Sequence, residues 1–218
     1  MSLLQNASPI SLLIRTNKVK PVYFYTVIIL LASLLLAISS QFKVPLGPVP
    51  VTLQSLVVML IGTLFGWRLA GATVIAYWVE GIIIGGLFSF MPWFANGSGL
   101  LYFLTSPSSG FLWGFLPMVL FVGFSMKLLV KEDIKNNVFY NLFVISAILL
   151  VSQVVLYIFG IAHAYFIILP TVDWMNSFDE LIAIYLTPFI IGDVLKTLLA
   201  VLITYKIMTY LGKKLTKI

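Results

Sequence analysis

The chain has 218 residues, of which 61% are hydrophobic and only 9% are charged, and its mean hydropathy is +1.10. A soluble domain usually carries about 25% charged residues, so this composition excludes an ordinary soluble protein and indicates an integral membrane protein. The sequence has no cysteine and a single histidine, which excludes disulfides and a dense metal cluster. We interpret the net charge of +6 as a membrane-topology signal rather than as a nucleic-acid surface.

Hydropathy along the chain predicts an all-α, polytopic membrane protein with six transmembrane helices in a single domain, residues 1–218. A proline-rich, non-helical turn that includes Pro45 and Pro50 separates the first two helices, and Gly66 lies at a tight return between the second and third. The length leaves no room for a soluble ATP-binding domain. The expected spans are about 22–40, 50–66, 69–87, 109–130, 138–161 and 188–211.

Basic residues are distributed unevenly between the two sides of the expected bundle. Lys43 lies on one side, and Lys196 lies within the sixth span. Because cytoplasmic loops are enriched in Lys and Arg, the side with most basic residues, which also holds both termini, is expected to be cytoplasmic. The residues on that side are Arg15, Lys18, Lys20, Arg68, Lys127, Lys131, Lys135, Lys206, Lys213, Lys214 and Lys217.

Two long connections are then expected on the outer side of the membrane. The connection at 88–108 contains no charged residue and is rich in Gly, Pro, Ser and aromatic residues. Irregular backbone is tolerated at membrane depth only where it is buried in protein or lines a cavity. We therefore expect this segment to fold over the outer mouth of the bundle. The connection at 164–186 is expected to be a second outer loop with a short surface helix.

An acid and a base lie three residues apart at the start of the sixth span. Asp193 and Lys196 share one helix face at this spacing, and we interpret Thr187 and Pro188 as the N-cap and first turn of that helix. Charges within membrane helices cost about 2.5–3.5 kcal/mol each on insertion scales and usually face a cavity. We therefore expect a site for a small solute, in which the carboxylate accepts N–H groups and the ammonium binds an oxygen. The alternative is a structural ion pair that docks the sixth span.

Glu80 lies inside the third expected span, where an ionisable residue is a candidate ligand contact or proton carrier. It could equally pack the helix by pairing with Tyr77, Lys196 or a backbone group, and Tyr77 is included with it as a candidate ligand contact. Gln54 and Gln153 are interpreted as interhelical hydrogen-bond partners.

Asn96 and Ser98 lie in the charge-free connection and are also candidate ligand contacts, with turn formation as the alternative. Ser98 and the lone histidine, His163, are the residues that an intramembrane serine hydrolase would need. However, the small-residue signature that precedes such a serine is missing, and His163 lies at a span end. We therefore expect a protein that is not an enzyme, with no catalytic residues and no metal site.

Several motifs follow one another over about residues 44–200. The motifs are Val44-Pro45-Leu46-Gly47-Pro48-Val49-Pro50-Val51-Thr52-Leu53-Gln54, Gly66-Trp67-Arg68-Leu69, Tyr77-Trp78-Val79-Glu80-Gly81, Pro107-Ser108-Ser109-Gly110-Phe111, and Pro188-Phe189 with Gly192-Asp193 and Lys196. In order and spacing these motifs resemble the BioY family, the biotin-binding S components of energy-coupling factor (ECF) transporters.

The resemblance implies uptake of biotin, as a transported ligand and without a cofactor, by a multi-pass protein of the bacterial cytoplasmic membrane. Asp193 would accept the ureido N–H groups and Lys196 would bind a ureido or a carboxylate oxygen; which end of biotin each residue meets stays open. No Arg or Lys occurs at 69–126, so a carboxylate would otherwise need neutral donors such as Asn96 and Ser98. An S component for another small vitamin is the alternative.

The resemblance also implies partners. Besides membrane lipid, these are biotin and an ECF module, which consists of a transmembrane coupling subunit and a pair of ATPases; reorientation of a solitary chain is the alternative. No nucleic-acid partner is implied. The family's Ala-x-x-x-Ala docking surface on the first span has its nearest counterpart in the small residues Ser33 and Ala37.

Overall fold

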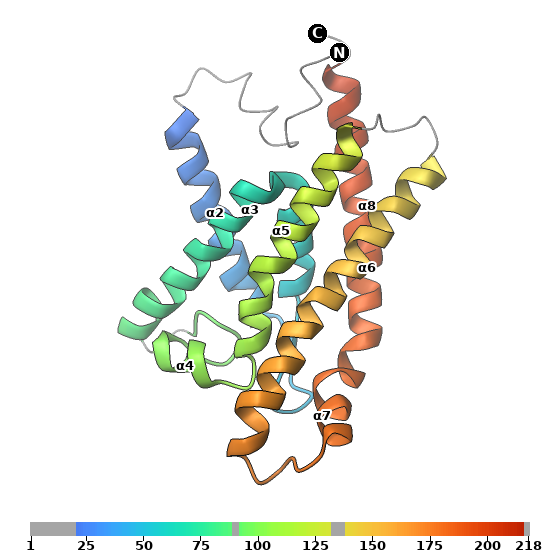
Figure 1. The fold of residues 1–218 in the computed structure, drawn as a ribbon. Helices are drawn as coiled ribbons and strands as arrows, with labels where there is room; N and C mark the ends of the chain where they lie inside the picture. The colour runs from blue at the N-terminus through green and yellow to red at the C-terminus, as the bar shows by residue number, and fades with distance from the viewer. Residues whose placement is uncertain (1–20, 89–91, 132–137, 216–218) are drawn as a thin grey trace.

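The computed structural model describes residues 21–88, 92–131 and 138–215, most of which form long helices that run side by side (Figure 1). The helices are α2 (Pro21–Gln41), α3 (Gln54–Leu87), α4 (Gly99–Thr105), α5 (Ser109–Lys131), α6 (Val138–His163), α7 (Phe178–Tyr185) and α8 (Ile190–Leu215). Shorter turns are the π-helical η1 (Ala164–Ile168) and the 3-10 helices η2 (Leu169–Thr171) and η3 (Thr187–Phe189). The all-α membrane fold expected from the sequence is confirmed.

Helix α3 is broken at Gly66, whose backbone has φ +72° and ψ 162°. This left-handed region suits glycine because it has no Cβ. The chain turns back there, so α3 contributes two antiparallel segments, 54–65 and 67–87 (Figure 1). By length and composition, five helices of the described chain could cross a membrane, and the break in α3 turns one of these into two crossings.

The first segment of α3 is too short to cross a bilayer by itself. At about 1.5 Å per residue, residues 54–65 extend for about 18 Å, whereas a hydrocarbon core is about 30 Å thick. The preceding chain covers the remaining depth as a hairpin of two short antiparallel strands, β1 (Lys43–Val44) and β2 (Val51–Thr52), with Lys43 opposite Thr52. The predicted proline-rich turn connects these strands, and its irregular backbone lines the pocket described below.

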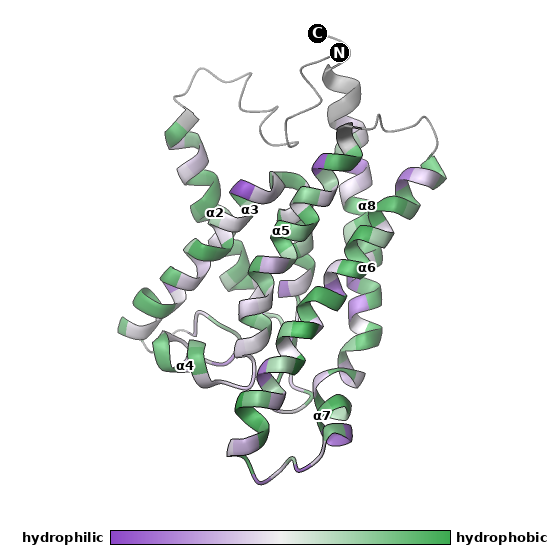
Figure 2. Cartoon of the chain, viewed as in Figure 1, coloured by the Kyte–Doolittle hydropathy of each residue, from purple (hydrophilic) through white to green (hydrophobic). Residues whose placement is uncertain are grey.

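Close packing of α3 against α5 depends on glycine. A Cβ at Gly123 would lie 2.3 Å from the backbone nitrogen of Trp67, so any larger residue would push the two helices apart. Around this contact α3 also packs against α2 and α8, and α6 packs against α5 and α8. The exposed residues of the helices include many aliphatic and aromatic side chains, as expected of a surface in contact with lipid. Hydrophobic residues occur along the length of the helices (Figure 2).

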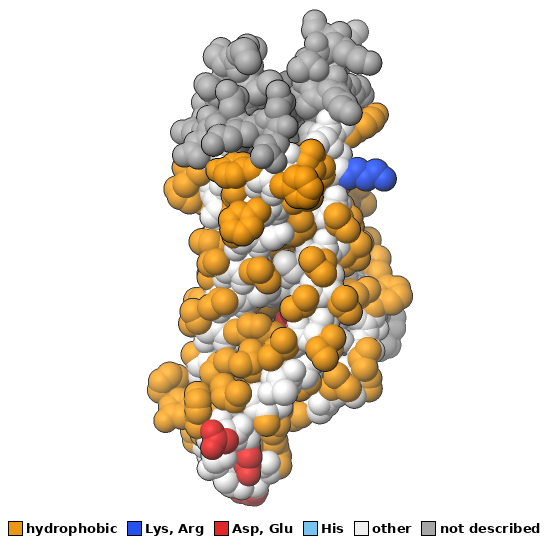
Figure 3. All heavy atoms as spheres, turned by 90° about the vertical axis from the view of Figure 1, so that its right-hand side faces the viewer, with side chains coloured by type: hydrophobic (Ala, Val, Ile, Leu, Met, Phe, Trp, Pro, Cys, Tyr) orange, Lys and Arg blue, Asp and Glu red, His pale blue; other side chains and the backbone are white. Residues whose placement is uncertain are grey.

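Polar and charged groups concentrate at the ends of the bundle. Acidic side chains gather at the end that carries α7, and a basic side chain lies toward the other end (Figure 3). Helix α2 begins and α8 ends at this other end, whereas the hairpin, α4 and α7 lie toward the end with the acidic side chains (Figure 1). The cytoplasmic location of the termini stays a prediction, because the first twenty and the last three residues lie outside the described chain.

Two local predictions need correction. The segment 88–108 is not only a loop, because it contains the helix α4, which has no charged residue to mark it. Thr187 is not the N-cap of the last helix: it is the first residue of η3, and its hydroxyl donates to the carbonyl of Ile182, at 3.3 Å. The Pro188 ring makes a tight 3-10 turn there, and α8 starts only at Ile190.

Candidate functional site

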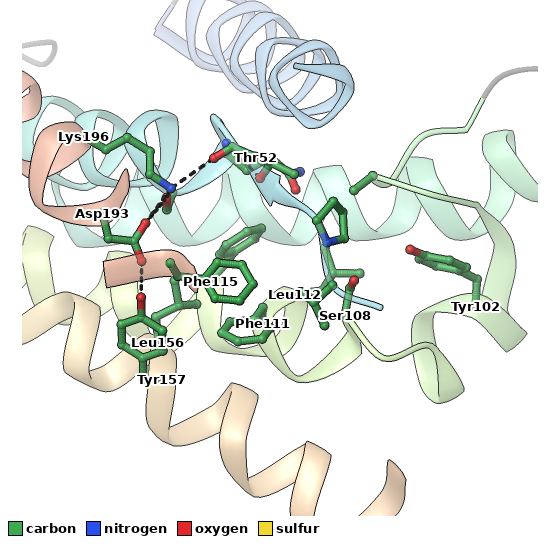
Figure 4. A pocket seen from close by; sticks show the side chains of 16 residues that line it. Thr52, Tyr102, Ser108, Phe111, Leu112, Phe115, Leu156, Tyr157, Asp193 and Lys196 are labelled. Atoms are coloured by element: carbon green, nitrogen blue, oxygen red, sulfur yellow. Dashed lines mark hydrogen bonds and ion pairs between the residues drawn. The ribbon is translucent and has the colours of Figure 1, made fainter. Parts of the chain in front are cut away.

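A pocket lies where the β1–β2 hairpin and α4 meet the helices α3, α5, α6 and α8 (Figure 4). The empty space within it is about 540 Å³, and part of this space is open to solvent. The residues that line it are Val49, Pro50, Thr52, Gln54, Ser55, Ala95, Tyr102, Ser108, Phe111, Leu112, Phe115, Leu156, Tyr157, Phe189, Asp193 and Lys196.

The predicted acid–base pair forms one end of this pocket. Asp193 Oδ1 and Lys196 Nζ lie 2.5 Å apart, on the same face of the first turns of α8, as their spacing requires. The two residues are only 7% and 8% exposed. A charge buried this deeply needs a partner, and here each charge neutralises the other.

Every donor of the Lys196 ammonium is already used within the protein. Besides Asp193, Nζ donates to the backbone carbonyl of Thr52 at 3.1 Å and to Ser55 Oγ at 2.7 Å. The ammonium has three donors, and it therefore has three acceptors. The Thr52 contact joins α8 to strand β2, so the hairpin and the ion pair form one hydrogen-bonded unit.

Two residues that sequence reasoning missed complete the shell around Asp193. The Ser55 hydroxyl donates to Oδ1 at 3.4 Å, and the Tyr157 hydroxyl makes a short hydrogen bond to Oδ2. They come from α3 and α6, on either side of α8. No periodicity within one helix connects them to Asp193, so the sequence offered no signal for either contact.

The middle of the pocket is apolar. Phe111 and Phe115 of α5 face Phe189 of η3, with the ring centroids of Phe111 and Phe189 5.7 Å apart. Behind this wall Tyr185 of α7 stacks on Phe111, with centroids 6.3 Å apart and an interplanar angle of 8°. The 164–186 segment thus supports the wall of the pocket without being among the residues that line it.

Tyr77 and Glu80 are not among the residues that line the pocket. Tyr77 is fully buried, and its hydroxyl accepts a hydrogen bond from Nε2 of Gln54, at 2.6 Å. Gln54 does line the pocket, so Tyr77 lies behind Gln54 and holds its side-chain amide through this hydrogen bond. Glu80 accepts a hydrogen bond from the Ser33 hydroxyl of α2, at 2.8 Å, which makes it a link between helices. Ser33 is therefore buried against α3, as is Ala37 within the core, and neither is available as a docking surface.

Asn96 and Ser98 also lie outside the pocket lining and instead fix the segment that covers it. Ser98 Oγ accepts a hydrogen bond from the backbone nitrogen of Trp93, at 2.7 Å, and Asn96 Oδ1 accepts one from Lys43 Nζ, at 2.8 Å. Lys43 also donates to the carbonyl of Ala95, a pocket residue. Ser98 thus stabilises its own turn, Asn96 connects this segment to β1, and the role of both residues as ligand contacts stays a prediction.

Ser98 and His163 do not form the pair that a serine hydrolase needs. His163 lies against the Trp113 ring, with centroids 4.9 Å apart, and its Nε2 approaches the carbonyl of Leu104, at 3.5 Å. Ser98 bonds to Trp93 instead. Within the described residues, no His, Cys, Asp and Glu group of three or more could hold a metal ion.

The pocket therefore offers a neutral pair of opposite charges, an aromatic wall and a set of hydroxyls. Such a site binds a ligand that carries adjacent hydrogen-bond donors and an acceptor on an apolar body. A polytopic bundle that surrounds this kind of pocket is a membrane-embedded small-molecule binding protein.

Comparison with known proteins gives the family. A model described as the BioY family matches residues 14–213, so the chain belongs to the BioY family, and the resemblance seen in the sequence is confirmed. The "Biotin transporter BioY" of Rhizobium etli is 31% identical over 82% of this chain and 89% of that protein. The "Biotin transporter BioY" of Rhodobacter capsulatus is 41% identical, but over 45% of this chain and about half (49%) of that protein's length.

A solved structure shares the fold. It is the crystal structure of the S-component for biotin from an ECF-type ABC transporter, with a TM-score of 0.67 and 24% sequence identity. The match covers 86% of this chain and 92% of that chain. The described helices therefore have the arrangement of an S component.

Proposed function

We propose that this chain takes up biotin, as the high-affinity binding subunit of an ECF-type transporter in the cytoplasmic membrane of a bacterium. The observation that carries the proposal is the buried Asp193–Lys196 pair at the end of an apolar pocket, in a member of the BioY family. Biotin has a neutral ureido ring with two N–H donors and one carbonyl, an apolar thioether ring and a carboxylate tail. Asp193 accepts the ureido N–H groups, and the aromatic wall covers the apolar ring and excludes water, which strengthens those bonds.

The protein binds and does not catalyse, and no cofactor enters the scheme. Its partners in this proposal are biotin and an ECF module, which supplies the ATP hydrolysis for uptake. The names of the relatives and the fold of an S component support this assignment. Since Ser33 and Ala37 are buried, the coupling subunit would dock on other exposed apolar residues of the bundle.

The test is equilibrium binding of radiolabelled biotin to the purified protein. The wild type binds biotin tightly, and Lys196→Ala weakens binding at least tenfold, on the order of 1.4 kcal/mol or more. Lys127→Ala, an exposed lysine of α5, is the matched control and leaves binding unchanged. Competition with a panel of unlabelled vitamins tests the alternative, an S component for another vitamin: displacement by one of these, and not by biotin, would replace the assignment.

A further inference from the structure

The segment that covers the pocket, residues 92–98, is attached to the end of α2 through its backbone carbonyls. Gln41 Nε2 donates to the carbonyl of Pro92, at 2.8 Å. The hydroxyl of Ser40 donates to the carbonyl of Trp93, at 3.2 Å. Unpaired backbone carbonyls are costly to bury, so these bonds fix the position of the segment on α2.

The hydroxyl of Tyr77 in α3 joins this attachment to the pocket. It donates to the same Trp93 carbonyl, at 3.4 Å, and accepts a hydrogen bond from Gln54 Nε2, at 2.6 Å. A tyrosine hydroxyl has a single proton, which goes to Trp93, so the Gln54 amide is the donor in the other bond. Gln54 Nε2 also donates to the carbonyl of Leu36, at 3.4 Å. Both N–H groups of the amide are therefore used, and Gln54 is held in one orientation at the pocket wall.

These bonds lie where water cannot replace them. The side chain of Tyr77 is fully buried, and its ring lies edge-on to Phe94 of the covering segment, with centroids 5.4 Å apart. A Cβ at Gly81 would lie 2.2 Å from the Phe94 ring, so α3 accommodates this ring only because glycine is present there. Removing a buried hydroxyl leaves its former partner unpaired, which costs more than the bond itself contributes.

We infer that Tyr77 is a positioning residue with two partners: its hydroxyl orients the Gln54 amide in the pocket and holds the covering segment at Trp93. Tyr77 does not touch the ligand. The inference rests on the proposed function for its effect on biotin, but the attachment of the covering segment can be tested without any ligand.

The first experiment measures how often the covering segment opens. The sequence contains no cysteine, so a single introduced thiol is the one site for a maleimide. Ala95→Cys places that thiol on the covering segment, at a residue only 5% exposed, and its labelling requires local opening. We expect labelling without biotin to be about five- to tenfold faster when Tyr77→Phe or Ser40→Ala is added, since each removes one donor to the Trp93 carbonyl.

The second experiment separates the two partners of Tyr77 by titration calorimetry with biotin. Tyr77→Phe releases the Gln54 amide and should weaken biotin about fivefold. Ser40→Ala leaves the bond between Tyr77 and Gln54 in place, so the affinity should stay within twofold of the wild type. In a Gln54→Leu background, Tyr77→Phe should weaken biotin no further, because the group that it positions is gone.

Two controls exclude a general effect on the fold. Ala164→Cys places the thiol in η1, at a fully buried residue, and its labelling rate should be the same with and without Tyr77→Phe. Tyr165→Phe, which changes an exposed tyrosine of η1, should leave both the biotin affinity and the labelling of Ala95→Cys unchanged.

Three results would overturn the inference. The first is an unchanged labelling rate of Ala95→Cys when Tyr77→Phe is added. The second is an equal increase at Ala164→Cys, which would mean that the whole fold has loosened. The third is the same fivefold loss of affinity from Tyr77→Phe in the Gln54→Leu background. A wild type that does not bind biotin would overturn the proposed function, and the labelling rates alone would then decide whether Tyr77 holds the covering segment.

Discussion

The two ends of the pocket hold their polar groups in opposite ways. At one end, Asp193 and Lys196 project from a long helix, and side chains and backbone from α3, α6 and β2 satisfy them. At the other end, the hydroxyls of Tyr102 and Ser108 come from a short helix and a helix start, and the described protein gives them no partner. The protein itself pre-organises the polar groups of the first end, and it leaves those of the second end open to the pocket. Contributions from the two ends should therefore be separable by mutation.

The largest effect is expected from breaking the ion pair. Lys196→Ala or Asp193→Ala leaves one buried charge uncompensated, which costs about 3–5 kcal/mol of stability in addition to the loss of binding. The double variant removes both charges, so its melting temperature recovers toward the wild type while biotin binding stays lost. Thermal unfolding in detergent, followed with the binding assay, checks this. A double variant that still binds biotin would make the pair a purely structural ion pair, the alternative that the sequence left open.

A smaller effect is expected from removing the hydrogen bond that the Tyr157 hydroxyl donates to Asp193. Tyr157→Phe removes the hydroxyl that donates to Oδ2 and keeps the ring against Phe111. The Asp193 carboxylate then has more freedom to turn, and biotin should bind about fivefold more weakly. Calorimetric titration measures this, with Tyr165→Phe as the control. An unchanged biotin affinity in Tyr157→Phe would show that this hydrogen bond does not position Asp193 for the ligand.

The segment that contains Ala95 and Asn96 covers the pocket, and it should affect mainly the rate at which biotin dissociates. Lys43 lies on β1 and holds this segment through the Ala95 carbonyl, a part-buried contact, and through Asn96 Oδ1, an exposed one. A hydrogen bond contributes about 0.5–1.5 kcal/mol, so Lys43→Ala should raise the rate of biotin dissociation about two- to tenfold. Stopped-flow displacement measures this rate, and Lys127→Ala is the control. An unchanged rate in Lys43→Ala would show that the segment does not restrain the ligand.

The smallest effect on binding is expected at Glu80. Its hydrogen bond with Ser33 joins α2 to α3 outside the pocket, so Glu80→Gln should leave biotin affinity within twofold of the wild type. Ser33→Ala, which removes the other partner, should behave in the same way. A tenfold loss in Glu80→Gln alone, measured by titration, would return Glu80 to the list of ligand contacts.

Features that depend on a single segment of the chain could be predicted from the sequence. Hydropathy located the spans because lipid contact imposes apolar composition on whole segments, and the family motifs agreed with them. The Asp193–Lys196 pair was predictable because helical periodicity alone places positions i and i+3 on one face. Neither argument extends beyond a single segment.

Contacts between segments were not predictable. Ser55 and Tyr157 reach Asp193 only because three helices meet there, and no local pattern marks either residue. Asn96 and Ser98 were chosen for their polarity in a charge-free loop, but Ser98 accepts a hydrogen bond from the loop backbone at Trp93, and Asn96 accepts one from Lys43 of β1. Thr187 has the residue type of an N-cap, yet the following proline makes a 3-10 turn and delays α8.

The most direct test of the central claim is an experimentally determined structure of the purified protein with biotin bound. We predict biotin in this pocket, with its ureido ring within hydrogen-bond distance of Asp193 and Lys196 and its apolar ring against Phe111. Biotin bound elsewhere in the protein, with the ion pair untouched and the pocket closed, would contradict the account.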